Sequence, residues 1–508
     1  MNRHRRNPLL VLVLALGLAL GLALGGGAMA QTLTVAQGAD ITSLDPHGQN
    51  DQPSSRVRRH IYETLVIQTE KLDLAPGLAE SWRQVNPTTF EFVLRQGVRF
   101  HNGDLFTAND VKFSFERLLN PATRAAGRFL LAMLDRVEVV DPRTVRLVTK
   151  FPFAPLLVHL THPVASILNQ RAITAAGADY GTRASVGTGP FKFVRWEAGS
   201  QVILERNNDW WGGRAGSERL IFRAIPEGTV RAIELETGGI DIAYALEPVD
   251  RERLQGDRNL KLVVAETLST AYVGFNARKA PFNDVRVRQA INHAVDVDAM
   301  VEVVYAGQAV RAQAPLPPRA FAAHPNLQAY SFNPERARAL LRAAGVPQGF
   351  RTSIWTNDNP LRIQMAEIMQ ANLREVGIIA DIQILEWSTY LTRTAAGEHD
   401  LFILGWVTVT ADADYGLFSL FHSANFGSPG NRTFWSDPRV DQLLDRGRAS
   451  IDPDARRRIY YEAQEIIQRE APWIFLLYPQ EVFGLRANVE NFVPHPAGHI
   501  NLTRVTKR

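Results

Sequence analysis

A strand, a helix and a second strand follow one another directly in the last third of the chain, and this order restricts the fold strongly. Residues 351–355 and 378–385 have the apolar content of strands. Between them, residues 362–376 place apolar side chains at helical spacing and stop at Gly377. Because a helical connection of this length returns the chain in the same direction, the two strands are predicted to lie parallel.

Helical and strand patterns alternate elsewhere too, which predicts an α/β fold. Residues 88–94 alternate apolar and polar positions, as a half-buried strand does. Thr107 and Asp110 have the spacing of a capping box at the start of a helix. Residues 401–406 are a continuous apolar run, which is typical of a strand buried on both faces.

The first thirty residues have the pattern of a secretory signal peptide. Arg3, Arg5 and Arg6 precede an uncharged apolar run at residues 9–24, and small residues up to Ala30 suit a signal peptidase. The run is shorter than the ~20 apolar residues that a membrane span needs. We therefore expect cleavage after Ala30 rather than a single membrane anchor.

The composition of the exported chain excludes several classes of protein. It has no cysteine, which excludes disulfides, thiolate metal sites and a lipid-modified cysteine. Without the signal peptide the formal charge falls from +4 to about +1, and no basic stretch interleaves with aromatics, so nucleic-acid binding is not predicted. An exported binder without an anchor is retained best behind an outer membrane, so we expect a periplasmic location. The exported chain of about 478 residues is too long for one core and should form two or three domains.

No motif predicts catalysis, a metal or a cofactor. The glycine-rich stretch at residues 187–191 contains Pro190, which lacks the N–H that a phosphate cradle needs. Asp412 and Asp414 could form a hydrolase pair, but ion pairing, helix capping and binding of a ligand amine are all better supported. The histidines are scattered and show no metal-ligand spacing.

Trp387 and Trp406 are the strongest candidates for pocket residues. Each ends an apolar run beside polar, turn-forming residues. An indole at the end of a strand offers an apolar wall and one hydrogen-bond donor, both useful in a ligand pocket. The residues alone therefore predict an exported α/β binding protein with a tryptophan-lined cleft.

Residues 78–118 (LAESWRQVNPTTFEFVLRQGVRFHNGDLFTANDVKFSFERL) resemble the hallmark segment of the peptide/nickel-type, family 5 extracellular solute-binding proteins. Further segments that resemble the family in order along the chain are residues 61–65, 187–191, 284–296, 333–345 and 471–474. The resemblance covers essentially the whole exported chain.

This resemblance implies a two-lobed periplasmic-binding-protein fold with a hinge and an additional third domain. Lobe I would combine residues 31–50, 187–270 and 484–508, the extra domain residues 51–186, and lobe II residues 271–483. The chain would cross between the lobes near Tyr272 and Asn276, and again at residues 477–483. Closure of the hinge would bury the ligand, and the closed form would dock on the permease of an ABC importer.

The resemblance also implies ligand-binding residues around Gly405 and Trp406. Peptide binders of this family place an aspartate for the peptide amine three residues after the tryptophan of such a pair, but Val409 occupies that position here. Asp412 or Asp414 would then have to bind the amine, because a buried ammonium needs a partner. The remaining residues implied by the resemblance are Asn50, Tyr272, Asn276, Trp387, Val407, Thr408 and Arg432, with Arg362 near the position of a carboxylate-binding arginine. Arg432 suits a ligand carboxylate, and an ion pair at the surface or between the lobes is an equal alternative.

Residues 405–415, together with Gly430, Asn431 and Arg432, look like the branch of glutathione and oligopeptide binders. We therefore expect a monomeric, non-enzymatic protein that captures peptides, including glutathione-like ones, for an inner-membrane ABC permease. A non-peptide solute such as a nickel chelate, an opine or a sugar oligomer is the alternative. An exported hydrolase using Asp412 and Asp414 is a remote third.

Overall fold

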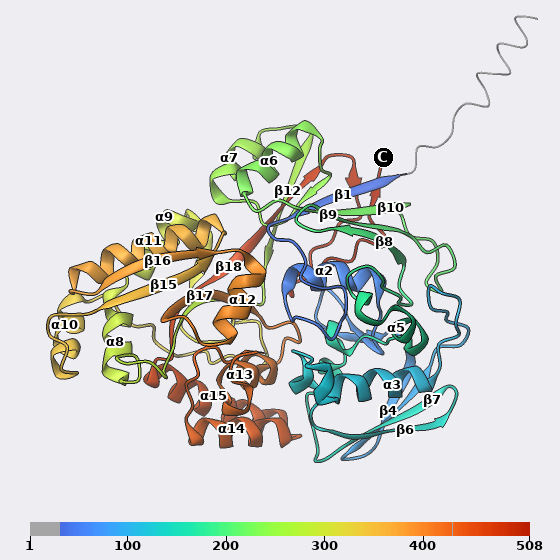
Figure 1. Ribbon diagram of the computed structural model, residues 1–508, viewed down its shortest axis with the longest axis horizontal. Coiled ribbons are helices and arrows are strands. Elements are labelled where there is room, and N and C mark those ends of the chain that lie inside the picture. Colours follow the sequence, from blue (N-terminus) through green and yellow to red (C-terminus); the bar gives the residue numbers. More distant parts are fainter. Residues whose placement is uncertain (1–30, 429) are drawn as a thin grey trace, which may run out of the picture.

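The computed structural model describes residues 31–428 and 430–508, so the predicted signal peptide lies outside the described residues. A 12-stranded mixed sheet extends through the molecule (Figure 1). In spatial order its main path is β16 (Ile379–Leu385), β15 (Arg351–Asn357), β17 (Leu401–Val407), β13 (Ser269–Phe275), β18 (Trp473–Arg486), β11 (Ile242–Ala243), β1 (Thr32–Gln37), β10 (Arg219–Ala224), β9 (Gln201–Arg206) and β8 (Phe191–Glu197); β12 (Leu260–Glu266) and β14 (Ala309–Arg311) also pair with β18.

The predicted strand–helix–strand unit is confirmed. Strands β15 and β16 are parallel neighbours along their full length, and α11 (Pro360–Glu375) connects them. The helix begins where expected from its sequence, because the Asn359 side chain accepts a hydrogen bond from the Arg362 N–H and Pro360 occupies the first turn. Met365, Met369 and Leu373 are buried on its inner face.

The long strand β18 belongs to both halves of the main sheet. Residues 473–477 pair with β13, whereas residues 480–486 pair with β12. We call β13–β17 with the first part of β18, and the helices and loops that connect these strands, the β17 half; β1 and β8–β12 with the last part of β18 form the β1 half. In Figure 1, β18 runs between the two.

The chain passes between these halves at Thr267-Leu268, between β12 and β13, and again within β18. The first crossing was expected near Tyr272 and Asn276. That position is wrong, because Tyr272 lies inside β13, which pairs with β17 along its whole length, and Asn276 directly follows the strand. The lobe and domain boundaries themselves stay a prediction.

A second, four-stranded antiparallel sheet lies beside the main one. Its order is β4 (Ala79–Asn86), β5 (Thr89–Leu94), β7 (Thr144–Thr149) and β6 (Leu134–Asp141). The helix α3 (Ala108–Leu119) contacts β6 and β7 and begins with the predicted capping box of Thr107 and Asp110. Two short antiparallel pairs complete the strands: β2 (Val66–Gln68) with β3 (Leu74–Pro76), and β19 (Val489–Glu490) with β20 (Thr506–Lys507).

Further helices cover the sheets and fill the space between them. They are α2 (Gln52–Ile61), α4 (Leu156–His159), α5 (Gln170–Ala176), α6 (Gly228–Thr237), α7 (Pro248–Gln255), α8 (Val285–Ala294), α9 (Val297–Tyr305), α10 (Pro334–Ala343), α12 (Trp387–Ala395), α13 (Ala413–Phe421), α14 (Pro438–Ala449) and α15 (Pro453–Glu470). One hydrophobic cluster joins Phe92 and Phe115 of the small-sheet region to Trp406 and Trp473 of the β17 half. The small sheet and the β17 half therefore share a core.

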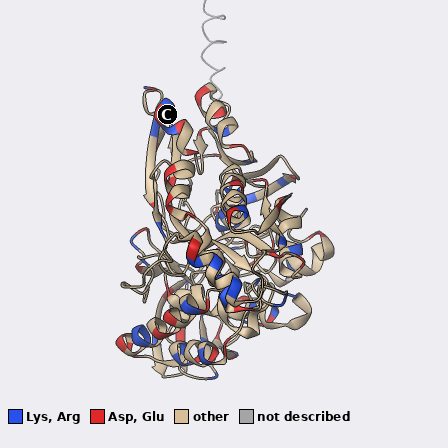
Figure 2. Cartoon of the chain, turned by 90° about the vertical axis from the view of Figure 1, so that its left-hand side faces the viewer, with Lys and Arg blue, Asp and Glu red and all other residues tan. Residues whose placement is uncertain are grey.

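The surface carries no large region of one charge on the side that Figure 2 presents, where basic and acidic residues are intermixed. Within residues 31–428 and 430–508, no helix combines the length and the hydropathy that a bilayer span needs.

Candidate functional site

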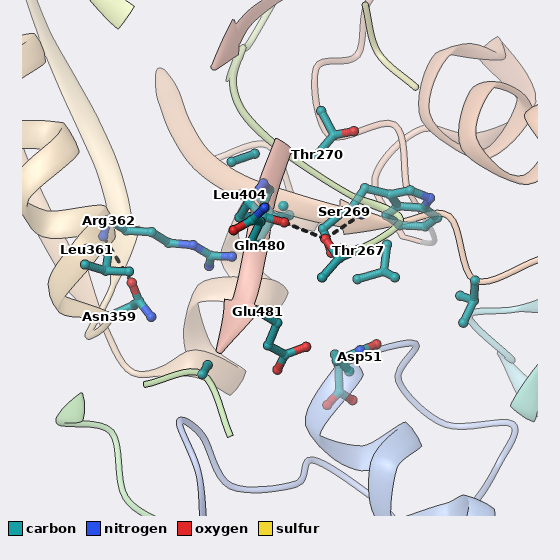
Figure 3. Close-up of a pocket in the computed structure, with 18 of the residues that line it drawn as sticks. Asp51, Thr267, Ser269, Thr270, Asn359, Leu361, Arg362, Leu404, Gln480 and Glu481 are labelled. Atoms are coloured by element: carbon teal, nitrogen blue, oxygen red, sulfur yellow. Dashed lines mark hydrogen bonds between the residues drawn. The ribbon is translucent and has the colours of Figure 1, made fainter. Parts of the chain in front are cut away.

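A cavity of about 340 Å³ lies where the chain passes between the two halves of the main sheet. This volume falls within the ~300–1,000 Å³ of small-molecule sites. Its lining includes Ser269 and Leu404 from the β17 half, and Ala245 and Glu481 from the β1 half. A ligand here would contact both halves at once (Figure 3).

The end of β17 forms one wall, with Leu404, Gly405, Trp406 and Val407 in the lining. On one side β17 pairs with β13 along its whole length, but on the other side β15 pairs only with its first two residues. Beyond these, no strand of the described part of the chain covers that edge. Unpaired backbone at a strand edge can accept an extended peptide as an additional strand.

The tryptophans predicted from their strand-end positions both line the cavity. The indole N–H groups of Trp387 and Trp406 are buried and find no acceptor among the described residues. Trp406 also packs against Tyr415, with 5.0 Å between ring centroids. A buried donor without a partner is unfavourable, so both indoles are suited to donate to a bound molecule.

Two arginines project from the β17 half into the same cavity, and neither has a carboxylate partner among the described residues. Arg432 is only 5% exposed, and its Nε donates to Thr394 Oγ1 at 3.2 Å. Burial lowers the pKa of this guanidinium. Arg362 donates from Nη1 to Asn357 Oδ1 at 2.8 Å, and its side chain reaches toward the middle of the cavity in Figure 3.

The opposite wall carries the carboxylates of Asp51 and Glu481. Asp51 caps α2 by accepting from the Ser54 N–H at 3.0 Å, and it also accepts from Thr42 Oγ1 at 2.7 Å. Glu481 forms an ion pair with Arg56 through Oε1. Its second oxygen has no hydrogen-bond partner in residues 31–428 and 430–508.

Asn50 joins the two sides of the cavity. Its Nδ2 donates to the Tyr415 hydroxyl at 3.1 Å, and His162 Nε2 lies 3.1 Å from the same oxygen. Burial raises the pKa of Tyr415, so the hydroxyl is neutral. The loop before α2 is therefore tied to α13 beside the cavity.

Asp412 and Asp414 do not reach the cavity, and this corrects the expectation that one of them meets a ligand. Asp412 forms a two-bond ion pair with Arg456, with Oδ1 2.8 Å from Nη2 and Oδ2 3.1 Å from Nη1. Asp414 is 1% exposed and lies 3.2 Å from both Arg448 and His159. Burial alone raises the pKa of Asp414, but Arg448 and His159 lower it to about 2. Both carboxylates serve the packing of α13.

Three other predicted residues are also buried away from the cavity lining. Tyr272 stacks on Trp473 with 3.5 Å between ring centroids. Asn276 donates from Nδ2 to the carbonyls of Gly397 and His399. Thr408 is 1% exposed. By contrast, the predicted residues Asn50, Trp387, Gly405, Trp406, Val407, Val409 and Arg432 line the cavity, as does Arg362; contact with a ligand stays a prediction for each.

Several lining residues at the two crossings between the halves were not predicted from the sequence. They are Thr267, Ser269 and Thr270 at the first and Gln480 and Glu481 at the second, together with Asp51 of the α2 cap. The polar stretch that interrupts two apolar strand patterns at residues 266–270 was a usable signal. No group of three metal-binding side chains assembles within the described residues.

The chain matches a known family and several characterised proteins over most of its length. The family described as "Bacterial extracellular solute-binding proteins, family 5 Middle" matches residues 73–428. A glutathione-binding protein of Pectobacterium atrosepticum is 32% identical over 459 residues, with 88% of each chain covered. Heme-binding protein A of Haemophilus influenzae is 32% identical over 471 residues, covering 87% of this chain and 86% of its own. The structure of the periplasmic binding protein DppA from Helicobacter pylori, in complex with the peptide STSA, superposes with a TM-score of 0.89 at 31% identity and covers 94% of this chain and 98% of its own.

Proposed function

The chain belongs to the family 5 bacterial extracellular solute-binding proteins, and from that premise we propose that it captures small peptides for an ABC importer. The observation that carries this proposal is the distribution of polar groups around one cavity. Donors of the β17 half face the carboxylates of Glu481, in the β1 half, and of Asp51, before α2, across the edge of β17 that no described strand covers beyond Phe402. A peptide has the complementary groups: a carboxylate, an amine and an extended backbone between them.

A peptide would lie with its carboxylate toward Arg432 and Arg362 and its amine toward Glu481 and Asp51. Guanidinium–carboxylate pairs are strong and directional, which suits recognition of the peptide terminus. The backbone of the ligand would pair with the open edge of β17. In this arrangement Glu481 and Asp51 take the role that Asp412 or Asp414 was expected to fill, and Val409 contributes only an apolar contact.

The biological setting follows from the same premise. We propose export with a signal peptide cleaved after Ala30, a periplasmic location and a monomeric state. Lobe I would comprise residues 31–50, 187–270 and 484–508, lobe II residues 271–483, and the extra domain residues 51–186. Closure over the ligand would create the form that an inner-membrane permease accepts. Proteins of this family bind solutes rather than convert them, and the ion pairs of Asp412 and Asp414 argue against a hydrolase.

The proposal is tested by thermal unfolding of the exported protein with a panel of dipeptides, oligopeptides and glutathione. A ligand at 100 times its dissociation constant adds about 2.7 kcal/mol to the free energy of unfolding. We expect at least one peptide to raise the melting temperature in a saturable way. A rise with a nickel chelate, an opine or a sugar oligomer, and with no peptide, would contradict the peptide assignment.

Native mass spectrometry of protein purified without added ligand provides an independent check. A mass difference equal to a peptide, lost on denaturation, supports the proposal. The same spectrum gives the mass of the mature chain, which should begin at Gln31 if cleavage follows Ala30. Release of cleaved peptide over time would instead indicate a hydrolase.

A further inference from the structure

The charged residues in the cavity wall formed by the β17 half are both arginines. Its two guanidinium groups, Arg362 and Arg432, have no ion-pair partner within residues 31–428 and 430–508. Arg362 lies over the Trp387 ring, with 5.8 Å between the guanidinium carbon and the ring centroid, and Arg432 donates to Thr394 of the same helix, α12. The two cations therefore both lie against α12, where the Trp387 indole N–H has no acceptor among the described residues.

Arg432 is held in this position by its surroundings. Its Nε donates to the buried Thr394, whose hydroxyl donates in turn to the Tyr390 carbonyl at 2.7 Å. The terminal nitrogens of Arg432 have no partner among the described residues, although the side chain is 95% buried. A buried charge is costly unless an opposite charge meets it. No residue in the described part of the chain supplies such a charge here.

The opposite wall carries charges of both signs. Glu481 pairs with Arg56 through one oxygen, and Asp51 caps α2. The lining as a whole contains three arginines (Arg56, Arg362 and Arg432) and two carboxylates (Asp51 and Glu481). A zwitterionic peptide of zero net charge would leave one positive charge of the lining uncompensated. A peptide with one additional carboxylate would compensate this charge.

Building on the proposed function, we propose that the preferred ligand is a small acidic peptide with two carboxylates, one bound by Arg432 and the other by Arg362. The second carboxylate can come from an acidic side chain or from the α-carboxylate of a γ-linked glutamate. Either source presents the same anion to the same guanidinium. Recognition of the pair of carboxylates, rather than of the peptide terminus alone, is then the basis of selectivity.

Calorimetric titration of the ligand-free protein with matched peptides tests this inference. Ala-Glu is compared with Ala-Gln, and γ-glutamyl-alanine with the derivative in which its glutamate α-carboxylate is an amide. In each pair only one negative charge changes. We expect the acid of at least one pair to bind tenfold or more tightly than its neutral partner, because a lost buried ion pair costs roughly that factor or more.

Variants assign the effect to the two arginines. Arg432→Gln and Arg362→Gln should each reduce the acid-to-amide ratio to about threefold or less. Arg351→Gln, which removes an exposed charge from the same half, should leave the ratio unchanged. If either variant is unfolded, the wild-type ratios still decide the question.

The outcomes separate this inference from the proposal beneath it. Equal binding of acid and amide by the wild-type protein overturns the two-carboxylate inference and leaves peptide capture intact. If the acid-to-amide affinity ratio is unchanged in both Arg432→Gln and Arg362→Gln, the assignment to these residues is overturned. Absence of binding by every peptide, here and in the thermal panel, overturns the proposed function itself.

Discussion

Two groups of buried charged residues lie close together in this protein, and only one of them is internally balanced. Around α13, Asp412 and Asp414 are paired with Arg456, Arg448 and His159. In the cavity, the buried Arg432 has no carboxylate partner in residues 31–428 and 430–508. A cluster whose charges cancel stabilises the fold, whereas one left unbalanced creates a requirement that a ligand can meet.

The largest expected effect comes from breaking the balanced group. Asp414→Ala leaves Arg448 and His159 buried without their carboxylate, so the free energy of unfolding should fall by about 3–5 kcal/mol. Urea denaturation measures this change. Peptide affinity of the folded variant should stay close to wild type, because Asp414 does not line the cavity. A stable variant that no longer binds would reverse the roles assigned to the two groups.

A smaller change in the free energy of unfolding, about 2 kcal/mol, is expected at His399 when the pH is lowered. This ring is buried, and neither of its nitrogens forms a hydrogen bond with the described residues; burial, Lys279 and Arg432 lower its pKa to about 3. Between pH 6.5 and 3 this histidine is protonated in the unfolded state but neutral in the folded state. The free energy of unfolding therefore decreases as the pH falls through this window.

His399→Leu should therefore lose about 2 kcal/mol less stability between pH 7 and pH 5 than the wild type. Urea denaturation at both pH values gives the comparison. Asp414 contributes to acid sensitivity in a different pH window. Because its pKa is about 2, the stability that it contributes is lost only below about pH 4. Equal acid sensitivity of the variant and the wild type would contradict the neutral, buried state of His399.

Removing the unbalanced charge should stabilise the empty protein. Arg432→Met replaces a buried cation, which has no ion-pair partner among the described residues, by an apolar side chain of similar length. The free energy of unfolding without ligand should therefore rise by about 1–2 kcal/mol. Calorimetric melting without ligand, checked against a denaturant titration, measures the change. A large loss of stability would mean that Arg432 is paired within the fold and would remove the basis for the acidic ligand.

The smallest effect is expected at the surface. Arg351 lies 3.4 Å from Asp381, and both side chains are largely exposed. Such pairs contribute little, so Arg351→Gln should change the free energy of unfolding by less than about 0.5 kcal/mol. Urea denaturation measures this change. A change above about 1 kcal/mol would show that exposed ion pairs contribute substantially to the stability of this protein, contrary to expectation.

Local patterns were sufficient to predict much of the fold. The parallel pair β15 and β16, the cap before α3 and the strand β17 each depend on residues close in sequence, and each is confirmed. The positions of Trp387 and Trp406 in the cavity lining also agree with their strand-end contexts.

The partners of charged residues could not be predicted in this way. Asp414 meets Arg448, 34 residues later, and His159, from far earlier in the chain. Glu481 and Arg56 are separated by 425 residues. Whether a carboxylate faces a cavity or an arginine depends on how distant segments pack, so the sequence pattern of Asp412 and Asp414 was consistent with either role.

The strand β18 contributes backbone to both halves of the sheet, and it carries Pro479, Gln480 and Glu481 of the cavity lining at the point where its pairing partners change. Any rotation of one half against the other must twist this same short stretch. If Glu481 contacts the ligand as proposed, ligand binding and any such rotation would act on the same three residues.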